Sequence, residues 1–146
     1  MDWKIETILV GVDGSEGSQR AAEYGASLAR ERSARLLLVT VVRPPEGWWG
    51  IGGAPPTPEA MSAALMEGQQ KILRDTEELL GLTDIEHETF EEVGDPATRL
   101  LAVSEEREAD LIVIGRRGAS LAERVILGSV ADRVCHLSVI PVLVIP

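Results

Sequence analysis

Residues 111–130 read LIVIGRRGASLAERVILGSV. The first four residues are apolar, glycines follow at Gly115, Gly118 and Gly128, and apolar residues then recur at helical spacing. An apolar run without polar alternation is typical of a strand that is covered on both faces in a parallel sheet. The segment therefore predicts a buried strand, a connection punctuated by glycine, and a helix.

The same succession of strand, connection and helix is repeated along the rest of the chain. Short apolar or β-branched runs predict strands at Ile8–Val12, Leu36–Val42, Leu111–Ile114 and Val142–Ile145. A fifth strand is predicted at Ile85–Val93, where acids alternate with other residues, a polarity that an edge strand tolerates. Strands that alternate with helices are joined by right-handed crossovers and form a parallel sheet. The sequence thus predicts a single α/β domain, residues 1–146, with a doubly wound five-stranded parallel sheet and helices on both faces.

Capping residues predict where the helices begin. Thr57 before Pro58 and Asp95 before Pro96 have the chemistry of an N-cap followed by the first helical residue. The helix after Asp95 should end near Ala109. The second helix and the last helix are each expected to bury one apolar stripe, formed by Met61, Leu65, Ile72 and Leu79 in the second and by Val130, Val134 and Leu137 in the last.

Composition and charge argue against several classes of function. The formal net charge is −10, whereas a nucleic-acid binder needs a basic face to displace counterions from phosphates. The apolar runs are far shorter than the ~20 residues that cross a bilayer, and the segment Met1–Glu6 lacks the basic start of a secretory signal. The lone Cys135 fits a reducing compartment and is expected to be a small buried hydrophobe. We therefore expect a cytoplasmic protein that binds neither nucleic acid nor a membrane.

The connections that follow the strands are the places to look for a ligand. In a doubly wound sheet, ligands bind beyond the carboxyl ends of the strands, where the winding direction reverses. Three of these connections are unusual, namely Gly11–Ser15, Arg43–Pro58 and Gly115–Ser129. The second contains five prolines, four glycines and the pair Trp48-Trp49. We expect it to be a long loop, either a mobile cover beside the ligand or a disordered insertion.

The third connection has the chemistry of a phosphate site. Glycine at positions 115, 118 and 128 allows the backbone to approach a phosphate closely and to adopt positive φ. Ser129 and the free N–H groups of a first helical turn point toward an anion, and Arg117 can add charge-assisted hydrogen bonds. Any one of these glycines alone is more simply explained by a turn or a helix cap. Their joint placement between a strand and a helix favours the phosphate site.

The motifs Gly115-Arg116-Arg117-Gly118 and Leu127-Gly128-Ser129-Val130 resemble the universal stress protein family, and the similarity covers almost the whole chain. Ile8–Ser15 is similar to the first strand and turn of the family, Gly94–Ala97 to its third crossover, and Pro141–Ile145 to its closing strand. The resemblance implies a Rossmann-like fold of the adenine nucleotide alpha hydrolase type. Some members of the family bind ATP and others do not, and the glycine spacing of this chain is that of the first group.

Carried over to this chain, the resemblance implies a site for ATP, with Mg²⁺ held largely by the phosphates. The ribose is expected to meet Asp13 and the backbone at Gly115, and the adenine edge is expected to meet backbone groups near Val12 and Val41. The phosphates are expected at Gly118, Gly128, Ser129 and Val130, with Arg117. Asp13 is alternatively an ordinary turn and cap residue. Arg116 stands where the family commonly has a small hydroxyl residue, and it either leaves the pocket or strengthens a phosphate contact.

The resemblance implies a nucleotide-dependent stress-response or regulatory protein that binds ATP and does not turn it over. Two alternatives stay open, a slow ATP hydrolase or phosphoryl-transfer enzyme, and a dimeric interaction module with a vestigial site. No Walker-type loop is present in the sequence, and His87 and His136 are expected to lie away from the pocket, so no catalytic residue is assigned. The preference among ATP, AMP and cyclic AMP is also open. Because the family commonly pairs its closing strand across a two-fold axis, we expect a homodimer through Val142–Ile145, unless that strand is interior.

Overall fold

The computed structural model describes residues 1–43, 57–117 and 127–146. In chain order its elements are β1 (Thr7–Gly11), α1 (Glu16–Arg32), β2 (Arg35–Val42), α2 (Pro58–Leu80), β3 (His87–Val93), α3 (Pro96–Glu106), β4 (Leu111–Gly115), α4 (Ser129–Leu137) and β5 (Val142–Ile145). The predicted alternation of strands and helices is therefore confirmed. The loop expected between Arg43 and Pro58 falls on residues 44–56, with Trp48 and Trp49, and these lie outside the described residues.

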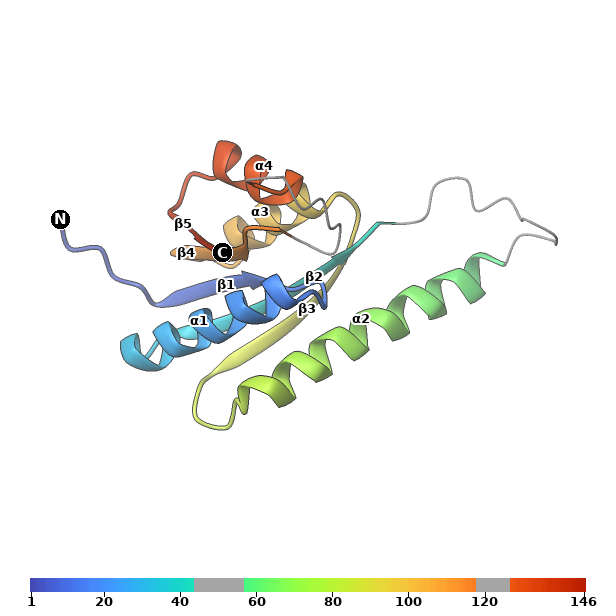
Figure 1. The fold of residues 1–146 in the computed structure, drawn as a ribbon, viewed down its shortest axis with the longest axis horizontal. Coiled ribbons are helices and arrows are strands. Elements are labelled where there is room, and N and C mark those ends of the chain that lie inside the picture. The colour runs from blue at the N-terminus through green and yellow to red at the C-terminus, as the bar shows by residue number, and fades with distance from the viewer. Residues whose placement is uncertain (44–56, 118–126) are drawn as a thin grey trace.

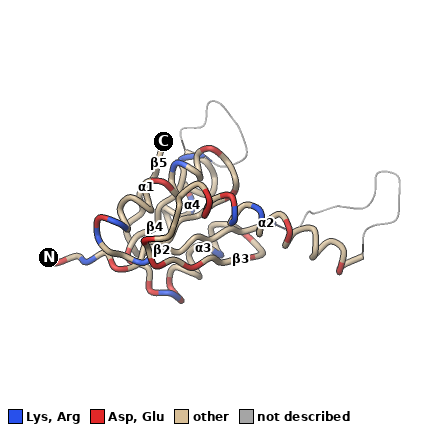
Figure 2. Tube along the Cα trace, turned by 90° about the horizontal axis from the view of Figure 1, so that it is seen from below, with Lys and Arg blue, Asp and Glu red and all other residues tan. Residues whose placement is uncertain are grey.

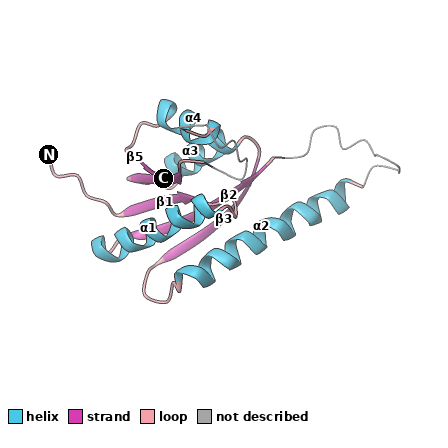
Figure 3. Ribbon diagram, viewed as in Figure 1, coloured by secondary structure: helices cyan, strands magenta, loops and turns pink. Residues whose placement is uncertain are grey.

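The five strands form one sheet in the order β3-β2-β1-β4-β5, and every pairing is parallel. Val10 of β1 lies opposite Leu38 of β2 on one side and Val113 of β4 on the other. The order of the strands thus reverses between β1 and β4, as expected for a doubly wound sheet. Strands β3 and β5 are the two edges, and Figure 3 shows the sheet lying between helices.

The helices cover both faces of the sheet because successive side chains of each strand point to opposite faces. Ile8 and Val10 pack in one core with α1 and α2, whereas Leu9 packs in the other core with α3 and α4. All three side chains are fully buried. Figure 1 shows α1 and α2 on one side of the strands and α3 and α4 on the other.

Helix α2 packs on the sheet only through its C-terminal half. Thr57 caps it, since its hydroxyl accepts from the Ala60 N–H at 3.1 Å, and Pro58 is its first residue, as predicted. Figures 1 and 2 both show the N-terminal part of the helix extending beyond the sheet. The predicted stripe is wrong at Leu79, which is 49% exposed. Residues Met61, Leu65 and Ile72 are only partly buried.

The buried face of α2 includes polar residues. The spacing of apolar residues alone therefore predicted the wrong buried face for this helix. Its buried residues are Gln69, Leu73, Thr76 and Leu80. Gln69 donates from Nε2 to the carbonyl oxygens of Thr40, at 3.3 Å, and Glu92, at 2.7 Å. The Thr76 hydroxyl donates to the carbonyl of Ile72, one turn earlier in the helix, at 2.7 Å. A polar side chain can be buried when its hydrogen bonds are made.

The last two helices also differ in detail from expectation. Helix α3 begins at Pro96 after the Asp95 cap, as predicted, but ends at Glu106 and not near Ala109, because the chain turns at Glu108 with φ of 53°. The buried residues of α4 are Ala131 and Val134, whereas Leu137 and Cys135 are exposed. The expectation of a buried Cys135 is therefore wrong, because its side chain lies on the outer side of the helix. Among the described helices, none is long and apolar enough to cross a membrane.

Candidate functional site

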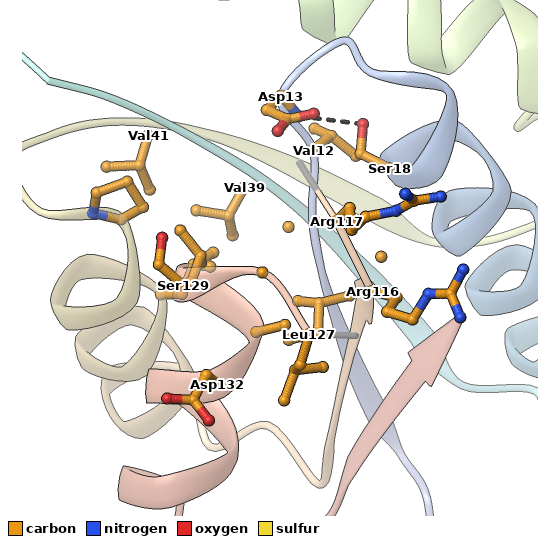
Figure 4. A pocket seen from close by; sticks show the side chains of 18 residues that line it. Val12, Asp13, Ser18, Val39, Val41, Arg116, Arg117, Leu127, Ser129 and Asp132 are labelled. Atoms are coloured by element: carbon orange, nitrogen blue, oxygen red, sulfur yellow. Dashed lines mark hydrogen bonds between the residues drawn. The ribbon is translucent and has the colours of Figure 1, made fainter. Parts of the chain in front are cut away.

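A pocket of about 510 Å³ opens at the carboxyl ends of β1, β2 and β4 (Figure 4). This is the place where the order of the strands reverses, and its size is in the range of small-molecule sites. Its lining residues are Gly11, Val12, Asp13, Ser18, Val39, Val41, Pro96, Leu100, Ile114, Gly115, Arg116, Arg117, Leu127, Gly128, Ser129, Val130, Ala131 and Asp132.

The structure brings the sequence-predicted residues together in this pocket. Those that line it are Val12, Asp13, Val41, Gly115, Arg117, Gly128, Ser129 and Val130. The ninth predicted residue, Gly118, lies outside the described residues. Residues from four distant parts of the chain therefore share one cavity, at the ends of β1, β2 and β4 and at the start of α4.

The turn after β1 forms one wall of the pocket. The Asp13 carboxylate accepts through Oδ1 from the Ser15 N–H, at 2.9 Å, and from the Ser15 hydroxyl. Ser15 is in turn the N-cap of α1, and its hydroxyl accepts from the Ser18 N–H at 3.2 Å. The Ser18 hydroxyl accepts from the Asp13 N–H at 3.2 Å, as Figure 4 shows. The turn-and-cap role considered for Asp13 is therefore present in the structure, on a residue that also lines the pocket.

The first turn of α4 forms the opposite wall. Gly128 is its N-cap and makes no side-chain capping bond, and its own N–H donates to the Arg116 carbonyl at 2.7 Å. The first bond within the helix runs from the Asp132 N–H to the Gly128 carbonyl, at 2.9 Å. The N–H groups of residues 129–131 come before that bond, and all three residues line the pocket. A helix N-terminus of this kind carries partial positive charge and suits an anion.

The sequence analysis expected positive φ at the glycines of the third connection, and this is wrong at Gly115 and Gly128, the two that the structure describes. Gly128 has φ of −67°, and the described glycines with positive φ are Gly14, Gly81 and Gly94. Gly115 matters instead because it has no Cβ, which allows α1 to pack directly on the end of β4.

Two arginines and one further aspartate add charge to the pocket. Figure 4 shows the guanidinium groups of Arg116 and Arg117 on the side toward α1 and β5, away from Val41 and Ser129. Arg116 lines the pocket, its Nε is buried, and this atom has no hydrogen-bond partner among the described residues. Asp132, on α4, brings a carboxylate to the other side. Among the described lining residues the charges of two arginines and two aspartates balance, and the anion-binding character comes from the helix N-terminus.

Asp95 is the N-cap of α3 and lies directly before the lining residue Pro96. Hydrogen bonds from the Thr98 hydroxyl, at 2.8 Å, and the Thr98 N–H, at 3.0 Å, lower the pKa of Asp95 from 3.8 to about 2, with a further contribution from Arg133. Arg133, on α4, donates to the same carboxylate oxygen at 2.6 Å. The carboxylate is therefore ionised throughout the neutral range.

The sequence analysis did not find several lining residues. Val39 and Ile114 belong to predicted strands, and their place near the strand ends was the signal that could have included them. Leu100 comes from α3 and Asp132 from α4, and only the packing of these helices brings them to the pocket. Ser18 lies on the first turn of α1, where its spacing from Asp13 could have predicted the hydrogen bond.

The two histidines lie outside the pocket, as expected. Nε2 of His87, in β3, lies 2.9 Å from the Glu77 carboxylate, and His136 is exposed on α4 with Nδ1 2.9 Å from the Asp132 carbonyl oxygen. No group of three or more His, Cys, Asp or Glu residues that could hold a metal occurs in the described part of the chain.

Comparison with known proteins finds relatives of the whole chain. A profile of the Universal stress protein family matches residues 4–146. The universal stress protein YxiE of Bacillus subtilis is 33% identical over 144 residues, which cover 94% of this chain and 97% of YxiE. The universal stress protein UspA from Lactobacillus plantarum has a TM-score of 0.82 at 24% identity, over 99% of this chain and 100% of UspA. A universal stress protein in complex with cAMP has a TM-score of 0.72 at 27% identity, over 97% of both chains. The chain therefore belongs to the universal stress protein family.

Proposed function

We propose that this chain is an ATP-binding member of its family, a cytoplasmic stress-response or regulatory protein that acts by binding the nucleotide and not by turning it over. The observation that carries the proposal is the first turn of α4, whose N–H groups lie at the pocket behind a cap residue without a side chain. Such a turn binds phosphate oxygens. The relative in complex with cAMP supports an adenine nucleotide as the class of ligand.

In the proposed mode of binding, the adenosine occupies the part of the pocket between β1 and β2. Adenine lies near Val12 and Val41, with the apolar side chains of Val39 and Leu100 beside it. The Val12 N–H already donates to the Val39 carbonyl at 2.9 Å. In the proposed mode the Val12 carbonyl oxygen accepts from the adenine amino group. The ribose meets Asp13 and the backbone of Gly115.

The phosphates occupy the part of the pocket at the start of α4. Gly128, Ser129 and Val130 provide the N–H groups and the hydroxyl that face them, and Gly118 belongs to the same proposed set. Arg117, whose guanidinium group lies on the side toward α1 and β5 in Figure 4, adds a charge-assisted hydrogen bond once its side chain turns toward the phosphates. Because the lining also contains Asp13 and Asp132, the phosphates need this helix N-terminus and a counterion.

Mg²⁺ is the proposed counterion, and the lining residues fit it. Mg²⁺ keeps several waters and is bound through one or two carboxylates together with substrate phosphates. Asp13 and Asp132 are the carboxylates that line the described part of the pocket. When bound, the ion would neutralise phosphate charge.

We further propose a homodimer paired along β5. This strand is an edge of the sheet, with Leu143 38% exposed, and Val139 just before it is 97% exposed. An apolar edge strand presents unpaired backbone groups and invites association. Symmetric pairing of two copies covers both edges at once.

The experiment that tests the function is mass spectrometry of the nucleotide released when the purified protein is denatured. ATP is the expected product, and titration of nucleotide-free protein with ATP, AMP and cAMP measures the preference. In a timed assay of the native protein with ATP, accumulation of ADP would identify a hydrolase. If the nucleotide-free protein binds none of the three nucleotides at millimolar concentration, the proposal is contradicted. The remaining alternative is then the dimeric interaction module with a vestigial site.

A further inference from the structure

The carboxylate of Asp95 joins three elements of the fold. It accepts through Oδ2 from the N–H and the hydroxyl of Thr98, at 3.0 and 2.8 Å, and so caps α3. Arg133 of α4 donates to the same oxygen at 2.6 Å. Arg43, directly after β2, donates to Oδ1 at 2.6 Å. One side chain therefore connects the start of α3, the end of β2 and the second turn of α4.

Each of these three elements contributes a wall of the pocket. Val41 lies two residues before Arg43, Pro96 directly follows the shared carboxylate, and Asp132 lies directly before Arg133. The connection thus spans the pocket from the proposed adenine side, at β2, to the proposed phosphate side, at α4. A change in the distance between α4 and β2 would alter the room for the ligand between them.

The connection is more specific in geometry than an ordinary surface ion pair. An isolated exposed pair contributes little to stability. Here one carboxylate, 31% exposed, accepts four hydrogen bonds from three elements. Neither arginine is in the pocket lining, so neither is placed to touch the ligand. Their contribution is to hold the elements that do.

We propose that Asp95 is a positioning residue for the phosphate end of the nucleotide site, which holds the first turn of α4 in place through Arg133 against β2 and α3. The inference rests on the proposed function. Its physical consequence is selective: loss of the carboxylate charge releases α4 and weakens binding of the phosphates. Binding of adenosine, which lacks phosphates, does not depend on α4.

The test is the affinity of the full chain for ATP and for adenosine, measured by calorimetry in three variants. Asp95→Asn removes the charge but keeps a good N-cap for α3, because Asn caps helices as well as Asp. We expect the ATP Kd to rise by about tenfold, a typical coupling for neighbouring residues, and the adenosine Kd to stay the same. Arg133→Gln, which leaves the α3 cap unchanged, should have the same effect. Arg99→Gln is the control, because Arg99 lies on α3 but pairs with Glu92, at 3.0 Å.

A merely structural role would lower both affinities together. Parallel loss of ATP and adenosine binding in Asp95→Asn and Arg133→Gln, or an unchanged ATP Kd in both, would overturn the positioning role and leave the proposed function intact. A parent protein that binds neither ATP nor adenosine would overturn the proposed function itself. If Asp95→Asn fails to fold, Arg133→Gln alone decides the question.

Discussion

Gly115 lies so close to the backbone of Gly17 that it has no room for a side chain. A Cβ on Gly115 would lie 2.8 Å from the carbonyl carbon and oxygen of Gly17, and a Cβ on Gly17 would lie 2.7 Å from the Arg117 carbonyl oxygen. These neighbours are backbone atoms, so no change of rotamer can relieve the contact. The two glycines hold the first turn of α1 against the end of β4, beside the pocket.

Gly115→Ala is therefore expected to lower the free energy of unfolding by about 1 to 3 kcal/mol, as overpacking does. Urea denaturation measures this change. Gly68→Ala is the matched control, since a Cβ there meets nothing within 4 Å and the residue lies inside α2. The control should gain about 0.5 to 1 kcal/mol from helix propensity. Equal stability of Gly115→Ala and the parent would show that the contact can relax.

Arg117→Ala is expected to weaken ATP binding by about ten- to a hundredfold, because a charged hydrogen bond contributes roughly 1.5 to 3 kcal/mol. The loss should be smaller for AMP, which lacks the outer phosphates. Calorimetry with both nucleotides measures the difference. Arg107→Ala serves as the control, because Arg107 is not among the lining residues of the pocket. Its guanidinium carbon lies 4.8 Å from the centre of the Phe90 ring. An unchanged ATP affinity in Arg117→Ala would reject the phosphate contact.

Gln69→Leu is expected to destabilise the protein, although it replaces a buried polar side chain with an apolar one of similar size. The carbonyl oxygens of Thr40 and Glu92 would lose the amide that now donates to both. The loss of a hydrogen bond costs about 0.5 to 1.5 kcal/mol in unfolding free energy. The same change at the exposed neighbour Gln70 should have little effect. Thermal unfolding of the two variants makes the comparison, and equal melting temperatures would contradict it.

The Asp95 carboxylate should make stability depend on pH in acid. Its pKa is about 2 in the folded protein, lowered from 3.8 first by the Thr98 hydroxyl, so the unfolded chain takes up the proton first as pH falls. The contribution is complete above pH 3.8 and is lost as the pH falls through about 2. With allowance for solvent screening, we expect the parent to be about 1 kcal/mol more stable than Asp95→Asn near neutral pH. A stability difference that stays constant between pH 6 and about pH 2 would contradict this linkage.

Leu143→Lys is expected to shift the protein from dimer toward monomer, because it puts a charge on the exposed side of β5. Sedimentation at micromolar concentration should give twice the chain mass for the parent. Val93→Lys makes the same change at an exposed position of the opposite edge strand, β3, and should leave the mass unchanged. A parent that sediments as a monomer would remove the dimer without affecting the nucleotide site.

The strands and the order of elements could be predicted because the signal for them is local. Leu111–Gly115 and Val142–Ile145 are short apolar runs of the kind that form strands in parallel sheets, and both are strands. The buried face of α2 could not be predicted in this way. Gln69 is buried because two strand carbonyls lie within reach of its amide, and the sequence near Gln69 does not contain that information.

The pocket could be predicted where glycines and helix starts mark it, at residues such as Gly115, Gly128 and Ser129. The apolar wall of the pocket could not be predicted, because Leu100 reaches the pocket only through the packing of α3 on the sheet. The connection through Asp95 also joins residues far apart in the sequence, Arg43 and Arg133. The capping motif predicted the Asp95–Thr98 bond but gave no indication of the two arginines.

The two edges of the sheet differ in chemistry, and this limits how copies of the chain can polymerise. Strand β5 is apolar, whereas β3 carries the exposed acids Glu88 and Glu91 along its length. Like charges brought face to face repel, so an acidic edge resists the addition of another strand. Growth of an endless filament needs two edges on every copy that accept another strand, and in the proposed dimer only β5 does so. If copies pair along β5 as proposed, association through sheet edges would therefore end at a closed pair.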